Sequence, residues 1–394
     1  MKKFLAMLLV LVTALSLCAC GGNTQVADGN EDAGYRIAMV TGLGDITDQS
    51  FNQATWEALE QFNADYPCTI QYFMPTSDDN SARIAATERA IANGYDVIVF
   101  PGYTHGATIA EISETYPDVK FIALDVAAGD ILQTAVSNKG ETYDYNPDNW
   151  NLSDYAYMDN VYCATYQEQV SGYMAGYAAV KLGYTKLGYL GGMAVPSVTR
   201  FGYGFIQGAD AAAQEMGVTV SMKYAYANQF YADPDITAVM DTWYNEGTEV
   251  VFSCGAAVWT SVAEAAKKVN GKMIGVDVDQ APVIDGAYGE GMTLTSAMKG
   301  LAPTTYDTLV DVLVNNNWNN YAGKIVALGV TSEIPEENYV QLSSSTLFEE
   351  GKFTYDDYTA LVSAIYSGTV TVSGDLTAEP ATTNVTVNYL GNIK

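Results

Sequence analysis

Four residues combine side-chain types that could bind a small polar ligand. Asp125 and Asp277 each come directly after an apolar run that predicts a strand, Lys299 follows a third such run, and Phe51 lies where a strand turns into a helix. An aromatic ring can stack on a flat ligand, and a carboxylate accepts paired hydrogen bonds from neighbouring hydroxyl groups. Together these side chains would suit a ligand that has a flat ring and vicinal hydroxyls.

Each of these residues also has a purely structural explanation. A carboxylate after a strand is more often a helix N-cap than a ligand group, Phe51 could equally be a core residue of a first helical turn, and a lysine such as Lys299 is usually solvated. Aromatic residues in loops pack more often than they bind, and Arg200 could form a surface ion pair instead. The remaining candidates for the same site are Asn52, Arg200, Phe230 and Trp259.

Chemistry beyond binding finds little support in the sequence. The single histidine, His105, is interpreted as structural or solvated, so histidine triads and multi-histidine metal sites are not expected. The motifs GxxxxGK[ST], HExxH and GxSxG and the EF-hand loop are absent, and Gly42-Leu43-Gly44 lacks the third glycine of a dinucleotide fingerprint. We therefore expect a binding protein without metal or cofactor, and not an enzyme.

The elements that must position these residues alternate along the chain. Apolar strands followed by amphipathic helices indicate parallel sheets that are covered on both faces. We expect strands at 36–41, 69–74, 96–100, 119–124, 186–190, 218–226, 249–254, 272–276 and 292–298. Among the helices between them, one is expected to be capped by Ser77. Residues 129–159 are rich in Tyr, Asn and Asp and predict a long surface insertion.

Two blocks of this alternation predict an α/β protein with two doubly wound lobes. We place residues 35–163 and a return segment of about 296–330 in the N-terminal lobe, and residues 164–295 in the C-terminal lobe. Residues 331–394 are expected to form a C-terminal extension that packs on the lobes. Ligands bind such sheets beyond the carboxyl ends of the strands, so two facing lobes joined by a hinge would form a cleft that closes on a ligand.

The first twenty residues predict export. Lys2 and Lys3 precede an apolar run at 4–17, which is short for a membrane span and suited to a signal peptide. The ending Leu17-Cys18-Ala19-Cys20 resembles a bacterial lipobox, and Cys20 fits the lipidated position better than Cys18, because Leu17 is too bulky beside Cys18. The alternative is an ordinary secretory signal. Residues 21–34 predict a flexible tether, so we expect a lipid-anchored protein on the extracytoplasmic face of the cell membrane.

Composition narrows the class of partner. The 394-residue chain has 18 basic and 46 acidic residues, a net charge of -28, which argues against nucleic acid as a partner. No run after the signal is long and apolar enough to span a bilayer. Cys68, Cys163 and Cys254 are widely spaced, which suggests buried free thiols. We expect a monomer.

Four motifs resemble those of the basic membrane protein (Bmp) family of lipoproteins, in the order of the family. They cover roughly residues 36–330 and are specific when taken together. The resemblance implies a type I periplasmic-binding-protein fold and a substrate-binding lipoprotein of an ABC importer, whose partners are a permease and, in many members, a purine nucleoside. The motifs are Gly44-Asp-Ile-Thr-Asp-Gln-Ser-Phe-Asn-Gln-Ala-Thr-Trp-Glu57, Leu190-Gly-Gly-Met-Ala-Val-Pro-Ser-Val-Thr-Arg-Phe-Gly-Tyr-Gly-Phe205, Ile274-Gly-Val-Asp-Val-Asp-Gln280 and Leu294-Thr-Ser-Ala-Met-Lys299.

The resemblance also implies roles for individual residues. Phe51 matches the aromatic residue that stacks on the base, and Asp125 matches a polar residue of the cleft. Asp277 and Lys299 match groups that bind the ribose hydroxyls. Phe252 and Gly255 lie near the family's second aromatic residue and a backbone contact.

Two positions depart from the family pattern. Gly42 stands where the family often has an Asp that reads the edge of the base, and Thr47 replaces another frequent Asp. Two alternatives to a nucleoside receptor therefore stay open. One is a binder of another small polar ligand such as a sugar. The other is a surface sensor or adhesin of the same fold that docks through its acidic tail, residues 335–394.

Overall fold

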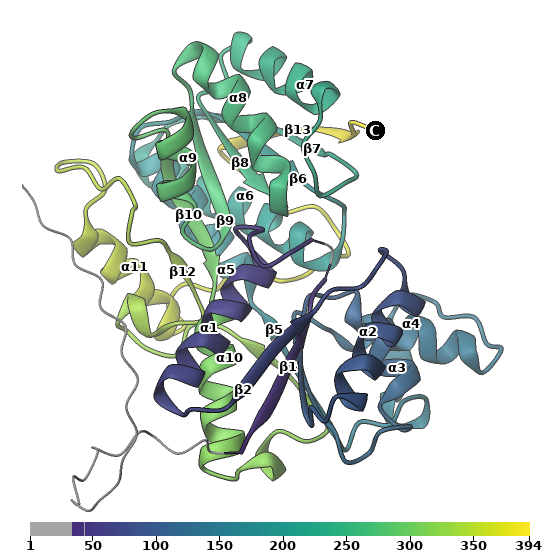
Figure 1. Ribbon diagram of the computed structural model, residues 1–394. Coiled ribbons are helices and arrows are strands. Elements are labelled where there is room, and N and C mark those ends of the chain that lie inside the picture. The colour runs from purple at the N-terminus through teal and green to yellow at the C-terminus, as the bar shows by residue number, and fades with distance from the viewer. Residues whose placement is uncertain (1–33, 43) are drawn as a thin grey trace, which may run out of the picture. The chain divides into compact units, whose positions relative to one another are not determined.

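The computed structural model describes residues 34–42 and 44–394. The expected signal peptide, Cys20 and all but the last residue of the expected tether lie outside the described residues. The described chain is built on two largely parallel sheets with helices on both faces of each (Figure 1). The prediction of two doubly wound lobes is therefore confirmed.

The first sheet gathers six strands of the described chain in the order β11-β5-β4-β3-β1-β2, all parallel to their neighbours. Every residue of its central strand β3 is buried, as expected for a sheet that is covered on both faces. The bounds are β1 (Arg36–Val40), β2 (Thr69–Phe73), β3 (Val97–Pro101), β4 (Lys120–Leu124), β5 (Val161–Tyr166) and β11 (Lys324–Leu328).

The second sheet has, within the described residues, the order β12-β10-β9-β8-β6-β7-β13. Its strands are parallel except β12, which pairs antiparallel with β10. The bounds are β6 (Lys186–Gly191), β7 (Val220–Tyr226), β8 (Val250–Cys254), β9 (Lys272–Asp277), β10 (Thr293–Lys299), β12 (Val340–Leu342) and β13 (Val385–Asn392).

Helices cover both sheets. In the first lobe α1 and α10 lie on one face and α2, α3 and α4 on the other (Figure 1). In the second lobe α5 and α6 share one core with the sheet, whereas α7, α8 and α9 share another. The bounds are α1 (Phe51–Asp65), α2 (Asn80–Ala92), α3 (His105–Ile112), α4 (Ala128–Asn138), α5 (Glu168–Lys181), α6 (Pro196–Met216), α7 (Pro234–Asn245), α8 (Trp259–Val269), α9 (Ala281–Tyr288), α10 (Leu301–Leu309) and α11 (Tyr355–Tyr366).

Two local predictions are wrong. The expected insertion at 129–159 contains helix α4, whose buried residues Ile131, Leu132, Ala135 and Val136 have helical spacing; the polar, aromatic composition of the stretch after it obscured this pattern. Helix α2 is capped by Asp79, which accepts a hydrogen bond from the backbone nitrogen of Ala82, and not by Ser77.

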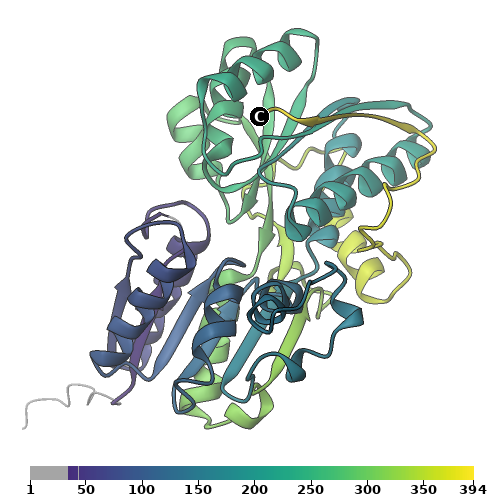
Figure 2. The same cartoon turned by 90° about the vertical axis from the view of Figure 1, so that its right-hand side faces the viewer.

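Within the described residues the chain passes between the lobes at three places, which form the hinge. Figure 2 shows the two lobes and the segments that connect them. The crossings are β5 to α5, β10 to α10 and β11 to β12. Backbone hydrogen bonds link them to one another: Gln167 donates to Leu328, Tyr339 to Gly329, and Gly300 to Tyr339. The first two crossings come later than our expected boundaries at 163 and 296, because β5 continues to Tyr166 and β10 stays in the second sheet up to Lys299.

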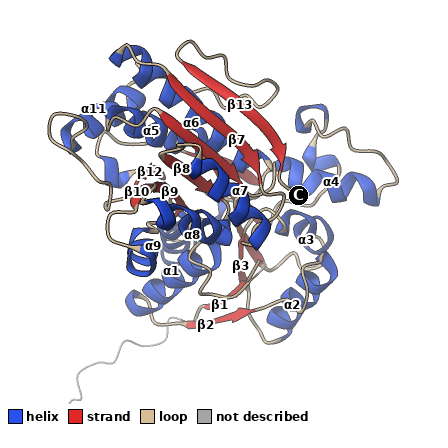
Figure 3. Cartoon of the chain, turned by 90° about the horizontal axis from the view of Figure 1, so that it is seen from above, coloured by secondary structure: helices blue, strands red, loops and turns tan. Residues whose placement is uncertain are grey.

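The residues after 330 supply both edges of the second sheet, β12 and β13. Figure 3 shows β13 beside β7. The carboxylate of the buried Asp210 on α6 anchors the start of this last strand, because its Oδ1 accepts hydrogen bonds from the backbone nitrogens of Thr383, Asn384 and Val385 at 2.6–2.9 Å. The acidic side chain thus ties the end of the chain to the second lobe.

Helices α5 and α6 approach each other so closely that glycine is required between them. A Cβ atom on Gly208 would clash with the carbonyl group of Tyr173, and one on Gly176 would clash with the carbonyl oxygen of Phe205. Because the obstacles are backbone atoms, no side-chain rotation can relieve the contact.

We predict that Gly208→Ala lowers the free energy of unfolding by about 1–3 kcal/mol or more, because the helices must move apart. Gly286→Ala is the matched control: it adds the same methyl group to the exposed face of α9, where no atom lies within 4 Å. Alanine there should be neutral or stabilise the protein by up to about 1 kcal/mol. Urea denaturation followed by circular dichroism measures both. Equal stability of the two variants would contradict the packing argument.

Candidate functional site

A cavity of about 400 Å³ lies between the two lobes, where the carboxyl ends of both sets of strands face each other. The first lobe contributes the turns after β1, β3 and β4 and the start of α1. The second lobe contributes the turns after β6, β7, β8 and β9 and the end of β10. The expected cleft is therefore present.

The structure brings most of the candidate residues to this cavity and leaves Arg200, Phe252 and Trp259 outside its lining. Phe252 is fully buried in the core, where its ring packs against Tyr189, Phe201 and Phe205. Trp259 packs edge-on against Tyr288. The candidates that line the cavity are Phe51, Asn52, Asp125, Phe230, Gly255, Asp277 and Lys299.

Asp125 and Asp277 share an unusual backbone conformation at the ends of β4 and β9. Their φ angles are 61° and 68°, in the left-handed region that residues other than glycine rarely adopt. Neither is the N-cap of the helix that follows; those positions are Ala127 and Gln280. Strained backbone of this kind concentrates at functional sites, and here it places both carboxylates in the cavity wall.

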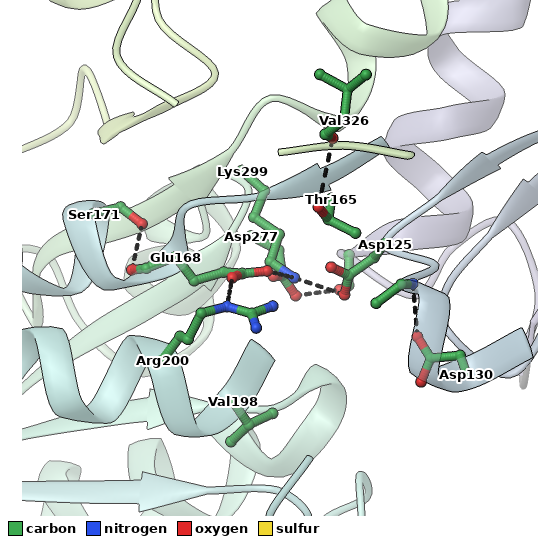
Figure 4. Close-up of polar contacts among 12 residues, drawn as sticks. Asp125, Asp130, Thr165, Glu168, Ser171, Val198, Arg200, Asp277, Lys299 and Val326 are labelled. Carbon is green, nitrogen blue, oxygen red and sulfur yellow. Dashed lines mark hydrogen bonds and ion pairs between the residues drawn. The ribbon is translucent and has the colours of Figure 1, made fainter. Parts of the chain in front are cut away.

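The ammonium group of Lys299 is the centre of a buried charge cluster (Figure 4). Its Nζ lies 2.8 Å from Asp125 Oδ2 and 3.2 Å from Glu168 Oε1. On its other side Glu168 accepts a hydrogen bond from Arg200 Nε at 2.5 Å. The exposed fractions of Lys299, Asp125 and Glu168 are 4%, 6% and 0%, so these charges are compensated by one another and not by solvent.

Electrostatics keep this lysine charged. Burial opposes the ammonium form, but the carboxylates of Asp125, Glu168 and Asp277 outweigh burial and hold the pKa of Lys299 above its ordinary value. Burial raises the pKa of Asp125 to about 6, although Lys299 opposes the shift. For Glu168 burial is outweighed by Lys299 and Arg200, which lower its pKa. A charged Lys299 therefore holds carboxylates from both sides of the hinge.

Aromatic rings surround the same ammonium group. It lies 4.9 Å from the ring centroid of Phe51, 5.5 Å from that of Phe201 and 5.7 Å from that of Tyr166. Such contacts stabilise a cation that has lost its hydration. Phe51 is half-buried, and its ring is both a partner of Lys299 and part of the cavity wall.

Two contacts join the lobes at the cavity edge. Ser50, next to Phe51, donates a hydrogen bond from its hydroxyl to Asp277 Oδ2 at 2.7 Å. The side-chain amide of Gln280 donates to the carbonyl oxygen of Gln49 at 3.3 Å. Asp277 therefore already accepts one hydroxyl hydrogen bond across the lobes, which is the chemistry expected of it toward a ligand.

Gly42 lies in the turn after β1, at the position where the motif resemblance implied an acidic residue. The backbone nitrogen of Gly42 donates to Asn52 Oδ1 at 2.9 Å, and a Cβ atom on Gly42 would lie 3.2 Å from the carbonyl oxygen of Pro101. Asp48 accepts backbone hydrogen bonds from Ser50, Asn52 and Gln53 and so holds the start of α1. Thr47 donates to Asp45 and does not line the cavity.

Several residues at the site were not expected from the sequence, among them Glu168 and Phe201 beside Lys299. Glu168 and Phe201 were not candidates, because nothing in the sequence distinguishes a buried glutamate or phenylalanine beside a lysine from an ordinary one. Arg200 acts from behind the cavity through Glu168. His105 is fully buried and stacks on Phe100 at 4.6 Å; burial lowers its pKa to about 3, so it is neutral.

Two further observations concern metal ligands and membrane-spanning helices. Among the described residues, no three His, Cys, Asp or Glu side chains are arranged to hold a metal ion. None of the helices within the described residues has the length and the apolar character needed to cross a membrane.

Comparisons with known proteins agree with this architecture. A solute-binding protein of an ABC transporter system from Aeropyrum pernix K1 superimposes with a TM-score of 0.64 at 18% identity, covering 87% of this chain and 94% of that one. This similarity confirms the predicted fold.

Sequence relatives point the same way. The chain is 26% identical over 287 residues to the ABC transporter nucleoside-binding protein of Lactococcus lactis subsp. cremoris. The matched residues cover 69% of this chain and 72% of the relative. It is 23% identical to an uncharacterized lipoprotein of Pyrococcus horikoshii, over 84% of this chain and 76% of the relative.

The Bmp family, described as ABC transporter substrate-binding protein PnrA-like, matches residues 36–363. Its members are substrate-binding components of transporters and not enzymes. The chain belongs to the Bmp family of ABC transporter substrate-binding proteins.

Proposed function

We propose that the protein captures a nucleoside, with purine nucleosides preferred, in the interlobe cavity and delivers it to the permease of an ABC importer. One observation carries this proposal: a single cavity combines an aromatic ring, Phe51, with two carboxylates, Asp125 and Asp277, supplied by opposite lobes. A nucleoside has the complementary parts, a flat base and a ribose with vicinal hydroxyls.

The arrangement assigns a role to each group. Phe51 stacks on the base, because its ring forms part of the wall at the start of α1. Asp277 accepts hydrogen bonds from the ribose hydroxyls, and Lys299 donates to a ribose oxygen while it remains paired with Asp125. Phe230 closes the second-lobe side of the cavity.

Base selectivity should be broad. Gly42 offers no carboxylate to the edge of the base, and the side-chain oxygen of Asn52 accepts a hydrogen bond from the backbone nitrogen of Gly42. Recognition of the base therefore depends on stacking and shape. The charges of the wall also disfavour an anionic ligand, because Asp48, Asp78, Asp125 and Asp277 line the cavity and Lys299 is its one lining cation among the described residues.

A lipid on Cys20 would keep the receptor at the extracytoplasmic face of the membrane, beside the permease. The ending Leu17-Cys18-Ala19-Cys20 and the lipoprotein relative support this placement. We propose that the receptor acts as a monomer, since one chain supplies both walls of the cavity.

We predict that Phe51→Ala weakens binding of inosine by about 1–3 kcal/mol, because stacking on the base is lost. Trp259→Ala is the control: it removes another large aromatic ring near the second-lobe wall that does not line the cavity. Calorimetric titration with inosine, adenosine, guanosine, uridine and ribose measures both effects. Tight binding of ribose alone would favour a sugar receptor, and no binding of any nucleoside would favour a sensor.

We predict that Asp277→Asn reduces the preference for inosine over 2′,3′-dideoxyinosine. The carboxylate accepts hydroxyl hydrogens that the dideoxy compound lacks, so the substitution should cost about 1–3 kcal/mol for inosine and much less for its analogue. Asp241→Asn, in the exposed ion pair with Lys268, is a matched control. An equal loss for both ligands would place Asp277 away from the ribose.

We predict that Cys20→Ser releases the protein from membranes. Mass spectrometry of the membrane-extracted wild-type protein should find a diacyl or triacyl group on an amino-terminal Cys20, because a thiol is needed for the lipid linkage. Cys18→Ser should leave the anchor intact. An unmodified amino terminus at another residue would contradict the lipoprotein assignment.

A further inference from the structure

A second cavity of about 300 Å³ lies beside the hinge and shares no lining residue with the interlobe cavity. Its walls come from β10, β12, the short 3-10 turn Pro335–Glu337, the loop after β9 and the start of α11. Aromatic rings and carboxylates stand out among the lining residues, beside apolar and neutral polar side chains. They include Phe348, Tyr355, Tyr358, Asp279 and Glu336.

The three rings present their surfaces in different directions. The ring centroids of Phe348 and Tyr355 are 5.7 Å apart with the planes at 89°, and those of Tyr355 and Tyr358 are 6.3 Å apart at 73°. Phe348 and Tyr358 are more nearly parallel, at 29° and 6.0 Å. The three rings therefore form one aromatic cluster in the wall of this cavity.

Hydrogen bonds hold the two tyrosines in place. Tyr358 is 2% exposed, and its hydroxyl accepts a hydrogen bond from the backbone nitrogen of Leu342 at 2.8 Å. The hydroxyl of Tyr355, which is 45% exposed, donates to Glu336 Oε1 at 2.7 Å and places that carboxylate at the mouth of the cavity. The rings are thus positioned before any ligand arrives, which lowers the entropic cost of binding.

The charge of the lining has one sign. Asp279 and Glu336 are carboxylates, and none of the residues that line the cavity is basic. Asp279 is held by the hydroxyl of Ser345 at 2.5 Å and by the backbone nitrogen of Ala281 at 3.2 Å. The faces of aromatic rings are also negative, so both groups favour a cation and disfavour an anion.

We propose that this cavity is a second ligand site, which takes a small organic cation with an ammonium group. The cation lies against the rings of Phe348 and Tyr355, and its charge is met by Glu336 and Asp279. A substituted ammonium ion fits this chemistry, because its charge can face the carboxylates while its apolar groups contact the aromatic rings. The site is separate from the nucleoside cleft and does not depend on the nucleoside assignment.

Choline is the probe that tests the charge requirement, and 3,3-dimethylbutan-1-ol is its neutral isostere. Calorimetric titration of the full chain should show saturable binding of choline and binding of the alcohol that is weaker by about tenfold or more. Equal binding of the two compounds, or no binding of choline at millimolar concentration, would overturn the proposal.

Variants locate the site. Glu336→Gln and Tyr355→Leu should each weaken choline binding about fivefold or more and leave inosine binding unchanged, because neither residue lines the nucleoside cleft. Glu350→Gln, at an exposed residue outside the lining, should change neither isotherm. If Asp277→Asn abolishes choline binding and Glu336→Gln does not, choline occupies the interlobe cavity, and the proposal is wrong.

Discussion

The buried ammonium group of Lys299 is the constraint on which the relation between the two lobes depends. Its partners come from separate parts of the fold: Asp125 ends a strand of the first sheet, and Glu168 begins the helix after the first crossing of the hinge. A buried charge that loses its partners costs several kcal/mol, so the ends of these elements must meet. Lys299 also lines the interlobe cavity, so the group that joins these elements is part of the cavity wall.

The left-handed aspartates show how each lobe keeps a carboxylate available. At the end of a parallel strand an aspartate would ordinarily cap the next helix. Asp125 and Asp277 have positive φ angles and do not cap the next helix. At the start of the helix after Asp125, the side chain of Asp130 accepts a hydrogen bond from the backbone nitrogen of Ala127. The cost in backbone strain is of the order of 1–3 kcal/mol for each residue, and the surrounding strands sustain it.

Much of the fold was predictable, because apolar runs that are buried on both faces stand out in the sequence. The positions of Asp125, Asp277 and Lys299 could also be inferred, since each directly ends such a run. The location of the Phe252 ring could not be predicted, because the sequence does not show which face of β8 packs against α5 and α6. In the structure this ring lies in the core. Glu168 could not be found, because its burial depends on Lys299 and Arg200, which follow much later in the chain. Helix α4 was hidden by its polar neighbours.

The position of β13 at the edge of the second sheet matters during synthesis of the chain. Synthesis runs from the amino terminus, so β7 is available long before the strand that covers its edge. Until residues 383–385 reach Asp210, that edge has unpaired backbone groups, which are a template for pairing with other chains. Once β13 pairs with β7, β13 itself becomes the edge strand of the sheet. A chain that lacks residues 385–392 would instead leave β7 as the edge strand, open to pairing with another chain.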